Sequence, residues 1–220
     1  MLTIENVETC GWDPALRGMR NPKDSWDRAD SSFCQNAFHS EEPELGPNDL
    51  KLATTLAKGG PVHAKYRRMI KVYCDITAPL YWWKEFDTYK VGTVANSCST
   101  MHTIHLRDLT LDDFAHERLS VCNTNLLRMI IDNINCARHY YNKHKDSDPE
   151  EAKEDWYQMI QLLPTSFLQK RTVEMNYEVL SNIYRWRHNH KQDEWKFFCE
   201  WIKTLPYADK LILVKNITFN

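Results

Sequence analysis

The sequence predicts an α+β protein in which helices dominate and a small mixed or antiparallel sheet is present. Three observations indicate this class. Apolar residues recur at helical spacing behind capping residues, mostly after residue 110. Short apolar or alternating stretches at 2–9, 69–76 and 211–218 are typical of strands. The length of 220 residues suits one domain with a substantial core, so a single domain over 1–220 is expected.

The first fifty residues are expected to begin with a strand and to continue into a loop. Residues 2–9 alternate apolar and polar side chains, and Asp13 with Pro14 then opens a short helix. Residues 21–48 are rich in Pro, Asp, Ser and Glu and predict a long surface loop. Loops of this length often act as lids or binding segments.

Two helices and a buried strand are expected between residues 48 and 92. Asn48 caps the first helix, and Gly59 with Gly60 ends it. A buried strand follows at 69–76, and Thr77 caps the second helix. That helix carries the apolar and aromatic side chains of Leu80, Trp82, Trp83, Phe86 and Tyr89. The small polar residues of 92–100 predict a loop after it.

The second half is predicted to be mostly helical. A helix is expected to start at Thr110, because Asp112 and Asp113 would place acidic side chains in its first turn, where they oppose the helix dipole. It is expected to run to about residue 141. Further helices are expected at 149–163, 173–187 and 191–204, followed by the strand at 211–218.

Composition excludes several classes of protein. The 28 basic and 30 acidic residues give a net charge of −2, which argues against a dedicated nucleic-acid surface. Only six glycines occur, and they form neither a dinucleotide-fold motif nor a P-loop. No apolar run reaches the roughly 18 residues of a membrane span, and the N-terminus lacks the pattern of a secretory signal. A cytoplasmic protein is therefore expected.

Cysteine and histidine spacing predicts neither a disulfide framework nor a metal site. The seven cysteines include no Cys-x-x-Cys pair, so reduced thiols are expected. His102 with His105, and His188 with His190, could chelate a metal, but solvated or core histidines are the expected outcome. The eight Trp, ten Tyr and eight Phe residues could stack a planar ligand, although an aromatic core or oligomer interface is favoured.

Arg17 and Arg20 define the first of three polar-rich stretches. They lie three apart on one helix face and could clamp a phosphate with paired guanidinium hydrogen bonds. The same arginines could instead form an ion-pair network with acidic residues at Asp24, Asp27 and Asp30. The sequence leaves both interpretations open.

The other two stretches are residues 84–100 and 185–195. In the first, a helix end delivers Tyr89 and Lys90 to a loop of hydroxyls, which could cradle an anion. Cys98 in this loop lacks a sequence-adjacent base, so an unreactive thiol is expected. Four positive or potentially positive side chains in 185–195 could hold phosphates or form a solvated helix junction.

The order of parts from Leu50 to Met101 carries a family resemblance. A helix and glycine turn lead to Val62-His63, an apolar strand follows, and Ala78-Pro79 opens a helix. This order resembles the flavin-dependent thymidylate synthases, which methylate dUMP using FAD and methylenetetrahydrofolate. Without a gap, Lys84-Glu85 falls on the family's Arg-Gln pair, and Thr88-Tyr89-Lys90 falls on its Arg-His-Arg. The stretch from Thr93 to Met101 falls on the remainder of the signature. Near the C-terminus, Arg187 with the run from His190 to Trp195 resembles the family's Arg and His-x-Gln-Trp-Glu element, with one residue of spacing different.

The resemblance implies an α+β homotetramer that binds a nucleotide and FAD at subunit interfaces. On the flavin side it implies His63, Tyr89, Lys90, Thr93, Asn96 and His190. On the nucleotide side it implies Glu85, Ser97, Cys98, Ser99 and Arg187. The implied reaction is reductive one-carbon transfer to a pyrimidine nucleotide such as dUMP, and no catalytic residue is assigned.

Departures from the signature predict an alternative function. Thr88 and Thr100 stand where the family has arginines that hold phosphate, and Asn96 replaces an acidic residue. These changes are typical of a non-catalytic module that binds a nucleotide or a partner on the same scaffold. An unrelated helical protein with a chance match is the third interpretation.

Overall fold

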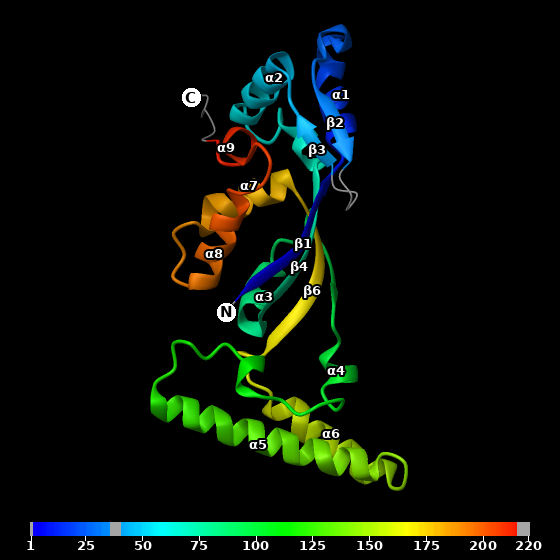
Figure 1. Cartoon of the computed structure of the whole chain (residues 1–220), viewed down its shortest axis with the longest axis vertical. Coiled ribbons are helices and arrows are strands. Elements are labelled where there is room, and N and C mark those ends of the chain that lie inside the picture. Colours follow the sequence, from blue (N-terminus) through cyan, green and yellow to red (C-terminus); the bar gives the residue numbers. More distant parts are fainter. Residues whose placement is uncertain (1, 36–40, 215–220) are drawn as a thin grey trace. The chain divides into compact units, whose positions relative to one another are not determined.

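A four-stranded sheet with the strand order β1-β4-β6-β5 joins segments that lie far apart in the sequence. Figure 1 labels three of these strands, β1, β4 and β6. The computed structural model describes residues 2–35 and 41–214. The strands of the sheet are β1 (Thr3–Cys10), β4 (Lys71–Pro79), β6 (Leu168–Asn176) and β5 (Val94–Ser97). A separate antiparallel pair is formed by β2 (Ser32–Gln35) and β3 (Glu41–Glu44).

The chain divides into two compact units, and β4, β5 and β6 each contribute residues to both. Unit 1 consists of Thr77–Phe86 and Ser97–Arg171. Unit 2 consists of Leu2–Ile76, Asp87–Asn96 and the chain from Thr172 onward.

Unit 1 is built around a helical hairpin. Its helices are α3 (Leu80–Phe86), α4 (Thr100–Thr103), α5 (Val121–His144) and α6 (Pro149–Leu162). The helices α5 and α6 lie side by side (Figure 1). The side chains of Ser120 and Asp148 accept hydrogen bonds from the first turns of these two helices. The apolar faces of both helices enclose a core that includes Ile104, Phe114, Leu127, Ile131, Ile134 and Met159.

Unit 2 has a second, aromatic core. Its helices are α1 (Trp12–Arg20), α2 (Pro47–Lys58), α7 (Tyr177–Arg187), α8 (Asp193–Ile202) and α9 (Ala208–Leu211). The rings of Trp12 and Tyr177 are fully buried and meet edge to face, with centroids 5.2 Å apart. Strand β4 supplies the alternating buried side chains of Val72, Cys74 and Ile76.

These elements confirm the α+β class predicted from the sequence. The strand at 2–9 and the helix at 149–163 are confirmed to within a residue at each end. The aromatic-core interpretation holds for the buried rings of Trp12, Trp82, Trp83 and Trp195. Among the described residues, none of the helices has both the length and the apolar character that a bilayer crossing requires.

The expected loop at 21–48 is partly wrong, because this segment contains local structure. Two 3₁₀ turns, Asn21–Lys23 and Trp26–Arg28, are followed by β2, β3 and the start of α2. Residues 36–40 of the expected loop lie outside the described residues. The carboxylate of Asp30 accepts the N–H groups of Asn48 and Asp49, so α2 is capped from a distance instead of by the side chain of Asn48.

The long helix predicted from Thr110 begins at Val121 instead. Thr110 and Asp113 form a capping box around the 3₁₀ turn Leu111–Asp113, which ends after a single turn. The start signal therefore belongs to that turn, and Ser120 provides the cap of α5.

Three further differences arise because residues predicted as helix or loop form strands. Strand β6 covers the first residues of the helix expected at 173–187, since Val173 and Met175 alternate with more exposed neighbours. Strand β4 continues through Thr77 to Pro79, and β5 lies within the loop expected at 92–100.

The final strand expected at 211–218 is wrong over its described part. Leu211 is the last residue of α9, and residues 212–214 form no strand. The remainder, 215–218, lies outside the described residues.

A buried ion pair joins α1 to α2. Arg20 is 3% exposed, and its Nε lies 2.7 Å from the Oδ1 atom of Asp49. The other two guanidinium nitrogens donate to the carbonyl oxygens of Ser25 and Arg28. Burial alone would raise the pKa of Asp49, but hydrogen bonds from Ser31, from the Asp30 N–H and from Arg20, with the charge of Arg20, lower it.

Replacing Asp49 with Asn should destabilise the protein strongly. The substitution leaves the Arg20 guanidinium buried without its counter-charge, which typically costs about 3 kcal/mol of unfolding free energy. Urea unfolding monitored by circular dichroism measures this loss. Asp13→Asn is the control, because Asp13 and Arg17 form an exposed pair whose loss should cost about 0.5 kcal/mol or less. Equal losses in the two variants would contradict the stabilising role of the buried pair.

The stabilisation by Asp49 should also depend on pH. Because the pKa of this carboxyl is lower in the folded protein than its ordinary value of 3.8, the unfolded chain takes up the proton first. The difference in unfolding free energy between wild type and Asp49→Asn is then fully present at neutral pH. It should shrink as the pH falls below about 4 toward the folded-state pKa. A difference that is constant from neutral pH to the acid limit of folding would contradict this assignment.

Candidate functional site

A cavity of about 460 Å³ lies in unit 1 and includes the predicted residue Cys98. This volume is within the range of small-molecule sites. Its apolar wall is formed by Ile104, Leu106, Leu109, Phe167 and Leu168. Its polar wall contains Cys98, Thr100, Thr103, Gln169 and Lys170. Such a combination suits a ligand with a flat apolar part and a charged part.

The backbone of Cys98 is fixed by hydrogen bonds to β6. The N–H of Cys98 donates to the Lys170 carbonyl oxygen at 2.9 Å, so the chain continues the sheet pairing beyond the end of β5. The carbonyl oxygen of Cys98 accepts a hydrogen bond from the Gln169 amide at 3.1 Å. Segments about 70 residues apart in the sequence therefore form one wall of the cavity.

Gln169 is itself held in one orientation. Arg171 Nε donates to the Gln169 Oε1 atom at 3.0 Å, and the guanidinium lies 4.2 Å from the centre of the Trp83 ring. The indole N–H of Trp83 donates to the Gln169 carbonyl oxygen at 2.9 Å. Trp83, a buried residue of α3, therefore helps to hold Gln169, whose side chain lines the cavity.

Two aspartates, Asp112 and Asp113, lie on the rim of the cavity, and Asp113 forms an ion pair. Arg107 donates to both carboxylate oxygens of Asp113, and the contact to Oδ2 is 2.9 Å. This hydrogen bond raises the pKa of Arg107 above its ordinary value. Burial opposes ionisation of Asp113, but hydrogen bonds from Arg107 and Thr110 and the charge of Arg107 lower its pKa. The charge of Arg107 is therefore balanced, and Lys170 is the other cationic side chain of the lining.

Unit 2 contains a second cluster, in which an arginine contacts two aromatic rings. Arg187 Nε donates to the Tyr89 hydroxyl oxygen at 2.9 Å. The guanidinium lies 4.8 Å from the centre of the Trp195 ring, and the rings of Tyr89 and Trp195 are 6.0 Å apart. The hydroxyl of Thr93 donates to the Tyr89 carbonyl oxygen, and the His190 ring lies 6.3 Å from Trp195. Four predicted residues therefore gather here: Tyr89, Thr93, Arg187 and His190.

The remaining predicted flavin residues lie on the surface of unit 2. The side chains of His63, Lys90 and Asn96 are exposed. His63 follows the turn at Gly59, where an added Cβ atom would approach its ring to 3.2 Å. The described contacts join none of these three to the cluster around Arg187.

The remaining predicted nucleotide residues lie in unit 1 near Cys98 or on α3. Ser97 is exposed at the end of β5, and Ser99 precedes α4, where its carbonyl oxygen accepts the Thr103 hydroxyl at 2.8 Å. Glu85 is half-buried on α3. Arg187, predicted for the same site, belongs to unit 2.

The phosphate clamp predicted from Arg17 and Arg20 is replaced by an ion-pair network. All three nitrogens of the Arg20 guanidinium are bound to protein atoms, and its charge is balanced by Asp49. Arg17 is exposed and pairs with Asp13 at 3.6 Å. Both arginines form ion pairs, but their partners are Asp49 and Asp13 and not the expected Asp24, Asp27 and Asp30.

Sequence reasoning missed Gln169, Lys170 and Arg107 as cavity residues. Gln169 and Lys170 lie in the polar run between Leu168 and Thr172, for which the sequence predicts neither helix nor strand. This run is part of β6, and successive side chains of a strand point to opposite faces. A strand predicted here would have indicated that some of its polar side chains face a cavity.

Comparisons with known proteins reveal a likeness only at the level of structure. No protein-family model and no curated protein matches the chain. Thymidylate synthase X (ThyX) from Helicobacter pylori, solved with FAD and dUMP, matches with a TM-score of 0.64 and 16% identity, covering 96% of this chain and 98% of that one. A second complex of the flavin-dependent enzyme from this organism gives 0.62 and 14%, covering 94% and 97%. The UMP/dUMP methylase PolB from Streptomyces cacaoi, bound to 5-Br dUMP, gives 0.56 and 16%, covering 96% and 91%. Over nearly its whole length, the chain therefore has a ThyX-like fold.

Proposed function

We propose that this protein binds a pyrimidine nucleotide in the unit 1 cavity, as a divergent relative of the flavin-dependent thymidylate synthases. The observation that carries the proposal is the fixed backbone of Cys98 on the wall of a 460 Å³ cavity. The segment that contains Cys98 is the one that resembles the family signature. The solved structures of similar fold contain dUMP or its bromo derivative.

Each part of a nucleotide has a matching part in the cavity. The apolar side chains, including Ile104 and Phe167, can contact the base and exclude water from it. Lys170 lines the cavity and can attract the phosphate as a point charge. Thr100 and Thr103 offer hydroxyls to the sugar or phosphate.

FAD is the cofactor that we propose for unit 2. The residues fit a flavin nucleotide in part. Arg187 already contacts Tyr89 and Trp195, so Lys90 would attract the phosphates; among described residues its ammonium group forms no ion pair. Asn96 would supply hydrogen bonds in place of a carboxylate. A bound flavin would supply reducing equivalents for one-carbon transfer to the nucleotide, and the proposed assembly is a homotetramer.

The alternative is a module that binds a nucleotide and catalyses no reaction. The pairing of Arg107 with Asp113 favours it, because this pairing satisfies the guanidinium of Arg107 within the protein and so withholds its charge from a phosphate in the cavity. Incubation with dUMP, FAD, methylenetetrahydrofolate and a reductant distinguishes the two functions. A methylated nucleotide product supports the enzyme, whereas nucleotide binding without product supports the module.

Replacing Lys170 with Ala should weaken binding of dUMP about tenfold, because the variant loses a charge-assisted contact to the phosphate. Isothermal titration calorimetry measures the change. Lys143→Ala is the matched control, since Lys143 is exposed on α5 away from the cavity lining. If the two variants bind dUMP equally well, or wild type binds no pyrimidine nucleotide, the proposed site is wrong.

Replacing Lys90 with Ala should reduce the rise in melting temperature that FAD produces in the wild-type protein. The reason is the loss of an ammonium group that would attract the cofactor phosphates. Lys51→Ala, an exposed change on α2, should leave that rise intact. A wild-type protein that purifies without flavin absorbance and shows no shift with FAD would refute the cofactor assignment while leaving the nucleotide site untouched.

A further inference from the structure

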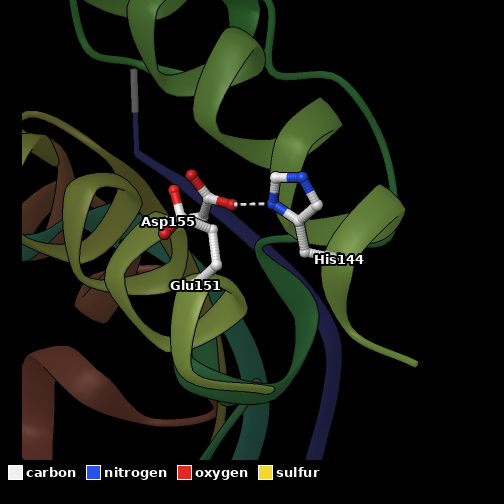
Figure 2. Close-up of side chains that lie close together, drawn as sticks. All are labelled: His144, Glu151 and Asp155. Atoms are coloured by element: carbon white, nitrogen blue, oxygen red, sulfur yellow. Dashed lines mark hydrogen bonds and ion pairs between the residues drawn. The ribbon is translucent and has the colours of Figure 1, made fainter. Parts of the chain in front are cut away.

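Three side chains with metal-binding atoms converge at one end of the α5–α6 hairpin (Figure 2). His144 lies in the last turn of α5, and Glu151 and Asp155 lie four residues apart on α6. One ligand atom from each lies within 4.8 Å of the other two. The Nδ1 atom of His144 is 3.0 Å from the Oδ2 atom of Asp155, and the Glu151 carboxylate lies beside them in Figure 2.

The backbone that carries these side chains is well anchored. Beyond the cluster, α5 and α6 pack through the buried side chains of Ile134, Ala137 and Met159. The connecting turn is fixed by the Lys145 N–H, which donates to the Tyr141 carbonyl oxygen, and by Asp148 as the cap of α6. The site would therefore form with changes in side-chain rotamers alone.

The charges in the cluster favour a divalent cation. With neutral histidine, the three side chains carry two negative charges. Neither Glu151 nor Asp155 has a lysine or arginine partner among the residues that the structure describes. The hydrogen bond from His144 offsets the repulsion between the two carboxylates only in part. A cation between them would offset it more fully.

We propose that His144, Glu151 and Asp155 bind a divalent transition-metal ion of the zinc class. One imidazole nitrogen and two carboxylate oxygens are ligands that zinc accepts, at bond lengths of about 2.0–2.2 Å. Tetrahedral bonds of that length place ligand atoms about 3.4 Å apart, so small side-chain rotations from the observed spacing suffice. Mixed nitrogen and oxygen ligands favour this class over magnesium or calcium, which take oxygen ligands. The site is independent of the proposed nucleotide function.

Cobalt(II) and zinc(II) are suitable probes for the intact, untagged chain. The wild-type protein should bind one Co²⁺ ion with visible absorption bands, and an equivalent of Zn²⁺ should displace it. Glu151→Gln and Asp155→Asn should each weaken binding at least about tenfold, because each removes one of three ligands. Circular dichroism verifies that each variant retains its helices.

Two neighbouring carboxylates provide matched controls. Glu150 and Glu154 are exposed on the same helix but outside the cluster, so Glu150→Gln and Glu154→Gln should bind Co²⁺ as the wild type does. Equal affinities in all four variants would overturn the proposal, since binding would then reflect the general charge of α6. Thiolate-to-cobalt charge-transfer bands would also overturn it, because they would assign the metal to one of the seven free cysteines.

Discussion

The hydrogen bond from the Cys98 N–H to the Lys170 carbonyl oxygen is the constraint on which the candidate nucleotide site depends. It extends the pairing of β5 with β6 by one residue and brings a signature-like loop against a strand that follows the helical hairpin. The Gln169 amide reinforces the same junction from the side, and Arg171 with Trp83 holds that amide in place. Both the apolar and the polar wall of the cavity draw on the two segments that this pairing joins.

Local sequence signals determined the helices of the fold better than its strand boundaries. The α6 helix was predictable because Asp148, Pro149 and the acidic first turn all indicate the same start. The capping pattern at Thr110 was equally strong, yet it belongs to a single 3₁₀ turn, and a local motif carries no information on how far a helix continues. Residues 173–176 form a strand because β6 pairs with β4 and β5. Those partner strands are distant in sequence, so periodicity within one segment does not reveal the pairing.

The residues of the candidate site also divide into those that the sequence indicates and those that only the fold reveals. Cys98 lies in a stretch whose order resembles a known signature, and the same residue lines a cavity, while its role in binding stays a prediction. Lys170 and Gln169 were missed because their role depends on the cross-strand neighbour. Arg20 shows the converse: two arginines on one helix face are compatible with a clamp, and only the fold reveals a buried carboxylate 29 residues away. Charge spacing along a helix therefore identifies polar clusters without identifying what neutralises them.

The way in which Asp30 and Asp49 hold the segment before α2 has a consequence for how this region can vary. Asp30 accepts two N–H groups from the start of α2, and Asp49 accepts the Asp30 N–H and the Ser31 hydroxyl in return. The conformation of this segment is therefore held mainly by hydrogen bonds to two carboxylates. Apolar burial contributes little, since the residues from Asp27 to Phe33 are all exposed or half-buried. Insertions and substitutions outside these hydrogen-bonded residues should be tolerated in this segment, provided that Asp30 and Asp49 are both retained.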